Sequence, residues 1–132
     1  MNIPIVPVLQ NTYYPPNQPT VKRCHAFGKS LAAAIGEWNS DARVAVVASG
    51  DLSHFVVDEE FDQRCLKGML DNDLDILYSL PKEKLNSGTS EVKNWITVSA
   101  AVDHLKMKLV DYVPGYRTLA GTGCAMGFAQ WT

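Results

Sequence analysis

Residues 44–56 read VAVVASGDLSHFV, and this stretch decides the fold. The apolar run over 43–49 predicts a strand, and a continuous rather than alternating pattern is typical of a parallel strand that is covered on both faces. The run ends abruptly at Gly50, and small and polar residues then lead to His54. Ligands of open α/β sheets bind at the carboxyl ends of the strands, so this is where we expect a site.

The segments on either side predict further strands and helices. Ahead of the stretch, an apolar run broken by two prolines predicts an edge strand, which a proline-rich loop connects to a helix. After it, Asp58 is a good N-cap for a second helix. In chain order we expect a strand at 3–10, a helix at 21–38, a strand at 43–49, helices that follow Asp58 and cover 73–80 and 90–106, a strand at 108–113, a turn at 114–116 and a last strand at 121–131. This order predicts one α/β domain over 1–132, with a mixed, largely parallel sheet flanked by helices.

The composition narrows the class of protein. The chain has 132 residues, 46% of them apolar and 20% charged, and its net charge is −2. No basic stripe indicates nucleic-acid binding, no apolar run reaches the roughly 18–20 residues that span a bilayer, and the N-terminus lacks the pattern of a signal peptide. Cys24, Cys65 and Cys124 are too few and too widely spaced for a disulfide framework or a cysteine-based zinc site. We therefore expect a cytoplasmic protein with reduced, buried thiols that binds neither nucleic acid nor membrane.

His54 is the first candidate for chemistry. An imidazole titrates near neutral pH and can accept or donate a proton. Gly50 would let the backbone turn sharply ahead of it, and Asp51 and Ser53 would cap or orient neighbouring groups. The residues alone leave two interpretations open: either the strand delivers an imidazole to a site, or the chain simply turns here and His54 is structural.

Glu91 is the second candidate. On a helix from about residue 90 it shares a stripe with Trp95 and two valines, which places a carboxylate on the face that enters the core. Such a position is rarely acidic unless the acid is paired or binds a metal, but an acid in the first turn of a helix, tilted towards water, would give the same pattern. His25 and His104 are predicted to be structural or on the surface, and no HxH, HExxH or CxxC spacing defines a complete metal site.

Three stretches together resemble one family: VAVVASGDLSHFV, the EEFDQRCL that follows it, and GTSEVKNWITVSAA at 88–101. The chain resembles, over nearly its whole length and beginning with NIPIVPVLQNTYYPPNQPTVKRCHAFGKSLAAAI, the catalytic subunit of the class III extradiol ring-cleavage dioxygenases. This is the superfamily of the protocatechuate 4,5-dioxygenase β-subunit, and the protocatechuate, gallate and homoprotocatechuate types are the most similar. The resemblance implies cleavage of a catechol-type ring with O₂ at an Fe(II) ion that two histidines and one glutamate hold.

The resemblance also assigns roles to residues. His54 matches the family's acid/base histidine, which takes a proton from a catechol hydroxyl, and Glu91 matches the glutamate ligand of the iron. Thr122 falls where relatives carry a small hydroxyl residue near the substrate, and we also predict substrate contacts from Asn11 and Thr12 in the loop at 11–20. The strand would then end in GDLSH because it presents a proton-transfer group to a metal-bound ring.

The two histidine ligands are where this chain departs from the family. They lie in an N-terminal half of the family's subunit, ahead of the segment that resembles this chain, and His25 and His104 do not fall at their positions. We therefore expect the C-terminal half of a dioxygenase subunit, which alone holds Fe(II) weakly. It would associate with the missing half, with a partner subunit, or with copies of itself as a homo-oligomer. The alternative is a non-catalytic binding or interaction module that keeps the fold without the iron site.

Overall fold

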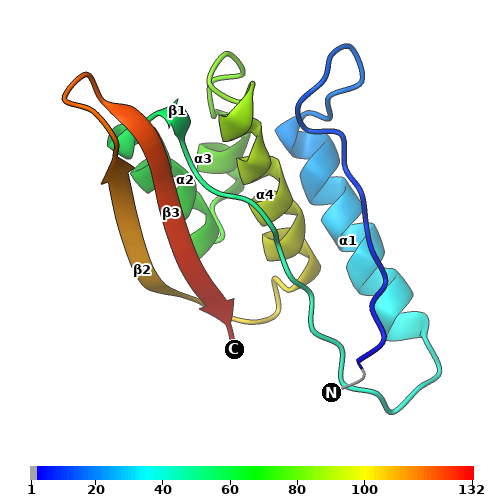
Figure 1. Cartoon of the computed structure of the whole chain (residues 1–132). Helices are drawn as coiled ribbons and strands as arrows, with labels where there is room; N and C mark the ends of the chain where they lie inside the picture. The colour runs from blue at the N-terminus through cyan, green and yellow to red at the C-terminus, as the bar shows by residue number, and fades with distance from the viewer. Residues whose placement is uncertain (1–2) are drawn as a thin grey trace.

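The computed structural model describes residues 3–132, with a small sheet on one side of the molecule and helices on the other (Figure 1). Helix α4 lies between α1 and the sheet, and α2 packs against β2. No helix in the described part of the chain is long and apolar enough to cross a membrane. In chain order the elements are α1 (Val21–Glu37), β1 (His54–Val56), α2 (Glu59–Leu70), α3 (Leu74–Tyr78), the 3₁₀ helix η1 (Gly88–Glu91), α4 (Val92–Ala101), β2 (Met107–Tyr116) and β3 (Thr122–Trp131).

The three strands form one antiparallel sheet in the order β1-β3-β2. The central strand β3 pairs with β2 along its whole length and with β1 at its start, where His54 lies opposite Cys124. β2 continues through Pro114–Tyr116, so the turn predicted at 114–116 is wrong, and the chain turns instead over residues 117–121. Proline is tolerated there because β2 is an edge strand of this sheet.

The predicted helices form, and α1, α2 and α3 have side-chain caps at their starts. Thr20 Oγ1 accepts the N–H of Arg23 at 3.2 Å ahead of α1, and Asp58 Oδ1 accepts the N–H of Phe61 at 3.0 Å ahead of α2. The helix predicted over 90–106 is shorter, since it begins as η1 and α4 ends at Ala101. After Ala101 the chain turns into β2. The backbones of residues 106 and 132 exchange two hydrogen bonds where β2 begins and β3 ends.

The core lies between α2, α4 and the sheet. On the side of α4 away from the sheet, α1 packs closely against α4. A Cβ on Gly28 of α1 would lie only 2.2 Å from the carbonyl oxygen of Thr97 in α4, so only glycine allows this approach. Cys24 and Cys65 are buried and free, as predicted, whereas Cys124 is free but only partly buried. The centre of the core contains Leu52, Phe61, Leu66, Met69, Val92, Trp95, Ile96 and Ala125.

Two of the predicted strands, at 3–10 and 43–49, are not strands. Both segments run extended across the molecule (Figure 1), but no backbone hydrogen bond joins residues 3–9 or 43–48 to another described residue. Most of their side chains face solvent, with Ile5 83% and Val47 82% exposed, whereas Ala48 is half-buried and packs against the core. A parallel strand needs a paired neighbour and cover on both faces, whereas residues 3–132 supply no paired neighbour and leave one face open. The largely parallel sheet predicted from the sequence is therefore not formed within this part of the chain.

The two extended segments nevertheless end together on α4. Gln10 Nε2 donates to Asn94 Oδ1 at 3.3 Å, and Asn94 Nδ2 donates to the carbonyl oxygen of Ser49 at 3.0 Å. Asn94 thus joins the carboxyl ends of both extended segments to the N-terminal part of α4. This is the place where the sequence predicts the site.

Candidate functional site

A turn at Gly50 brings the following residues against η1 and α4. Gly50 has a φ of +121°, a conformation that favours glycine, and a Cβ at this position would lie 2.8 Å from Cβ of Glu91. Trp95 Nε1 donates to the Gly50 carbonyl at 2.9 Å, and Glu91 Oε2 accepts the N–H of Asp51 at 3.0 Å. The carboxylate predicted from the sequence is therefore held at the end of the 43–49 segment.

Glu91 itself is half-buried at the end of η1. It does not enter the core with Trp95, which is 5% exposed, but faces the turn at Gly50. None of the ion pairs among residues 3–132 includes Glu91. A half-buried carboxylate without a cationic partner is suited to bind a metal ion.

β3 fixes the backbone around His54. The strands pair His54 with Cys124. Just ahead of β1, Leu52 donates its N–H to the carbonyl of Ala125 at 2.9 Å, and the carbonyl of Ser53 accepts the N–H of Ala125 at 2.8 Å. Ala125 is fully buried, so this pairing is anchored in the core.

The short helix η1 holds the other side of His54. Thr89 Oγ1 accepts the backbone N–H of His54 at 3.1 Å and donates to its carbonyl at 2.7 Å. The imidazole packs on Gly88, where a Cβ would lie 2.2 Å from ring atom Cδ2. Because Glu91 is the last residue of the same η1, this element brings the two predicted site residues to one place.

The imidazole has a defined orientation. Nδ1 of His54 lies 3.0 Å from the carbonyl oxygen of Leu52. A carbonyl can only accept, so Nδ1 carries the proton of the neutral ring and Nε2 keeps a free lone pair. The half-buried ring borders an open pocket of about 350 Å³, which Phe55, Lys84 and Thr89 also line. A base in this state can accept a proton from a hydroxyl that enters the pocket.

A buried network fixes the residue just ahead of His54. Asp62 is fully buried; its Oδ1 accepts the N–H of Ser53 at 2.8 Å, and its Oδ2 accepts the hydroxyls of Ser53 at 2.7 Å and Tyr112 at 2.9 Å. Burial raises the pKa of Asp62, and the hydrogen bonds from Ser53 and Tyr112 oppose that rise. The network ties α2 and β2 to the start of β1.

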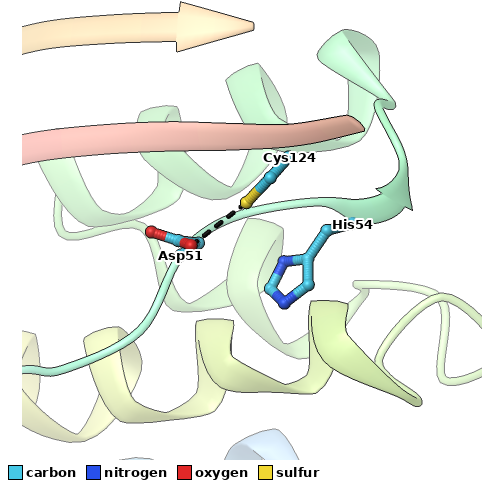
Figure 2. Close-up of side chains that lie close together, drawn as sticks. All are labelled: Asp51, His54 and Cys124. Carbon is cyan, nitrogen blue, oxygen red and sulfur yellow. Dashed lines mark hydrogen bonds between the residues drawn. The ribbon is translucent and has the colours of Figure 1, made fainter. Parts of the chain in front are cut away.

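Asp51, in the turn ahead of β1, and Cys124, on β3, lie next to each other beside His54 (Figure 2). Cys124 Sγ donates to Asp51 Oδ2 at 3.0 Å. Burial, the hydrogen bond to Asp51, and the negative charges of Asp51 and Glu91 raise the pKa of Cys124 to about 12. The thiol therefore stays protonated at neutral pH. Ligand atoms of Asp51, His54 and Cys124 lie within 4.8 Å of one another.

The residues predicted to contact substrate have other partners. Thr122 begins β3 opposite the last residue of β1, and its hydroxyl lies 2.7 Å from that of a threonine in the preceding turn. Asn11 is exposed and hydrogen-bonds both backbone groups of Tyr14. Thr12 is buried, and its hydroxyl accepts that of Ser90 at 3.1 Å. Thr12 thus supports η1, Asn11 stabilises its own turn, and substrate contacts from all three stay predictions.

The sequence alone does not identify Asp51 and Cys124 as members of one group with His54. They are 73 residues apart, and only the register of β1 on β3 brings them together. The sequence gives only a weak indication that each residue lies near a site: Asp51 directly follows the turn glycine, and Cys124 lies in a glycine-rich stretch. It could not show that the two stretches pair.

The described residues do not complete an iron site of the implied kind. Such a site needs two histidines and a carboxylate, and Glu91 supplies the carboxylate. The chain has three histidines. His54 is the predicted acid/base residue, His25 Nδ1 lies 3.1 Å from the hydroxyl of Tyr78, and His104 is exposed beyond the end of α4. No second or third ligand of that set is therefore present among residues 3–132.

Comparison with known proteins identifies the family. The model of one family, described as the catalytic LigB subunit of aromatic ring-opening dioxygenase, matches residues 1–127. No curated protein and no solved structure matches the chain. The matched span includes His54, Glu91 and both extended segments, and it confirms the resemblance that the sequence motifs carry. The chain therefore belongs to the family of the catalytic LigB subunit of aromatic ring-opening dioxygenases.

Proposed function

We propose that this chain contributes His54 as the proton-transfer group and Glu91 as the metal-binding carboxylate of an Fe(II)-dependent extradiol dioxygenase, which opens a catechol-type ring with O₂. The substrate belongs to the protocatechuate, gallate or homoprotocatechuate class. One observation carries the proposal: η1 holds His54 and Glu91 together, in a chain of the ring-opening dioxygenase family.

His54 has the features that a general base needs. The Leu52 carbonyl, 3.0 Å from Nδ1, leaves Nε2 as the acceptor, and two hydrogen bonds from Thr89 hold the backbone in place. A base that is already oriented requires no rearrangement before it accepts the proton of a catechol hydroxyl.

The pocket beside His54 supports a small aromatic substrate. Its volume of about 350 Å³ is near the lower end for small-molecule sites. Phe55 and Phe61 supply apolar and aromatic surface, while Lys84 and Ser87 supply donors for the polar substituents of a hydroxylated ring.

The two missing histidines have to come from outside residues 1–132, either from the missing N-terminal half or from a partner subunit, and the extended segments are where we place that part. Residues 3–9 and 43–48 have unpaired backbone groups and exposed apolar side chains, and both segments end at Asn94, three residues after Glu91. A partner strand that paired there would arrive next to the carboxylate. Burial of apolar surface would favour this association.

The second candidate is a non-catalytic binding module with the same fold. The incomplete ligand set favours it, because a protein that no longer binds iron has no need of the two histidines. It predicts an intact pocket and no O₂ consumption with any partner.

The two candidates separate in a complementation experiment. This chain is mixed with the N-terminal, histidine-bearing part of an active family member, cut ahead of the segment that matches residues 1–127. We expect a stable complex that binds one Fe(II) and consumes O₂ with a catechol carboxylate, whereas this chain alone retains little iron after desalting. A folded chain that gives neither iron binding nor O₂ consumption with that fragment would favour the binding module.

Variants then test the two roles. His54→Ala should keep the iron and lower the rate of ring opening by about 10²–10⁴-fold, the usual contribution of a positioned acid/base. Glu91→Ala should lose the iron. His104→Ala is the matched control, because this histidine is exposed beyond α4. Loss of iron in His54→Ala with retention in Glu91→Ala would reverse the assignments.

A further inference from the structure

Asp51, His54 and Cys124 converge from three places in the chain (Figure 2): the turn ahead of β1, the start of β1, and β3. We propose that they form a metal site of their own, which takes a thiophilic divalent cation of the Zn²⁺ class. All three side chains are partly exposed, so an ion can reach them from solvent. Two ligands on one zinc ion lie roughly 3.5 Å apart, given bonds of about 2.0–2.3 Å, so shifts of about 1 Å would close the present group on an ion.

The donor set selects the class of cation. A thiolate sulfur, an imidazole nitrogen and a carboxylate oxygen suit Zn²⁺ and its probe Co²⁺, whereas Mg²⁺ and Ca²⁺ prefer oxygen ligands only. The ring nitrogen of His54 on the side of Asp51 and Cys124 is Nδ1, which lies 3.0 Å from the Leu52 carbonyl oxygen (Figure 2). An ion that binds Nδ1 would replace this hydrogen bond, and the proton of the neutral ring would then sit on Nε2. Three protein ligands leave a fourth position for water.

The backbone holds two of the ligands in place before any ion arrives. Leu52 and Ser53 each share a hydrogen bond with Ala125, so the segment with Asp51 and His54 is locked to the strand that carries Cys124. Glu91 in addition accepts the N–H of Asp51. The group is therefore part of the sheet and its immediate extension, and binding does not have to order a loop.

The local charge also favours a cation. The charged groups that act most strongly on the Cys124 thiol are Asp51, Glu91 and Asp62, and all are acidic. They hold the proton on sulfur, and they would attract a divalent cation in its place. On binding, the S–H bond breaks, a metal–sulfur bond forms and the proton passes to solvent, with no change in oxidation state.

Occupation of this site would affect His54. An imidazole bound to a metal ion has no lone pair for proton transfer, so Zn²⁺ would oppose the ring opening proposed above. This consequence rests on the proposed function, whereas the binding itself does not.

Titration of the isolated chain with Co²⁺ tests the proposal. We expect one Co²⁺ per chain, a near-ultraviolet sulfur-to-cobalt charge-transfer band, release of about one proton, and displacement by Zn²⁺. Cys124→Ser should abolish the band and weaken Zn²⁺ binding by at least about 100-fold, since loss of a second-shell group alone costs about 10–100-fold. Cys24 and Cys65 remain in that variant and report any adventitious thiol binding.

Two further variants show whether the metal binds at this group of side chains. Asp51→Asn preserves the shape and a hydrogen-bond acceptor for the thiol, so it should fold normally and bind Zn²⁺ at least about 10-fold more weakly. His104→Ala should bind as the parent chain does. Circular dichroism and a thermal melt establish that each variant is folded. Absence of stoichiometric Co²⁺ binding by the folded parent, or unchanged affinity in both Cys124→Ser and Asp51→Asn, would overturn the proposal. O₂ consumption plays no part in this readout, so the proposed function can fail or stand independently.

Discussion

The segment at 43–49 and strand β3 are both largely apolar but have opposite surroundings. β3 pairs along both edges, and its Ala125 is fully buried. The 43–49 segment pairs along neither edge over residues 43–48, and its Val47 is 82% exposed. An apolar, β-branched run therefore indicates a segment that is suited to burial, but a paired neighbour has to be present before it becomes a strand.

The candidate site lies where these two regions meet. Residues 50–54 connect the exposed segment to the packed sheet, Glu91 holds the turn, and the Asp62 network fixes the start of β1. We expect substitutions in the packed region to lower stability and substitutions in the extended segments to leave it unchanged. The predictions below test this contrast, from the largest expected effect to the smallest.

A matched pair of isoleucines should show the contrast most strongly. Ile96 is fully buried in α4, so Ile96→Ala should lower the free energy of unfolding by about 2–5 kcal/mol through lost burial and an unfilled cavity. Ile5 is 83% exposed, and Ile5→Ala should change it by less than about 0.5 kcal/mol. Urea denaturation of the isolated chain measures both. Similar losses in the two variants would mean that residues 3–10 are packed in solution.

The buried polar network should give the next largest effect. Asp62→Asn keeps the shape of the side chain but turns an amide N–H₂ towards donors of Ser53 and Tyr112, which leaves buried donors unpaired. We expect a loss of about 2–3 kcal/mol in the free energy of unfolding. Asp41→Asn is the exposed control and should be neutral. Equal stability of Asp62→Asn and the parent would show that the network contributes nothing to holding β1.

Two glycines of α1 should respond with opposite signs. A Cβ on Gly28 would lie 2.2 Å from the backbone oxygen of Thr97, so Gly28→Ala should push α1 away from α4 and cost about 1–3 kcal/mol. Gly36 has nothing within 4 Å of the same position, so Gly36→Ala should stabilise the chain by up to about 1 kcal/mol through helix propensity. Thermal unfolding of the two variants measures the difference. A stabilising Gly28→Ala would contradict the close packing of α1 on α4.

These contrasts also show how far the sequence could predict the fold. Helix caps and helical periodicity are local, and α1 and α2 form where they are predicted. The segments at 3–10 and 43–49 carry a strand pattern that is equally clear, but strand formation depends on a neighbour, which no local pattern contains. The same reason explains the site. His54 and Glu91 could be selected from their motifs, whereas the contact between Asp51 and Cys124 depends on the pairing of β1 with β3 across 73 residues.

The smallest expected effect on stability is at Val47, and it sharpens the contrast most. Val47→Ser should change the free energy of unfolding of the isolated chain by less than about 0.5 kcal/mol, because the side chain is 82% exposed. In the complementation experiment the same variant should bind the histidine-bearing fragment about 10-fold more weakly, because a valine buried against a partner contributes about 1.5 kcal/mol or more. Val110→Ser is the control, since Val110 is 60% exposed on β2, outside the extended segments, and it should leave association unchanged. Analytical ultracentrifugation of the mixed fragments measures both. Equal association for Val47→Ser and the parent would place the partner elsewhere, and the exposed apolar run at 43–49 would then lack the neighbour that we assign to it.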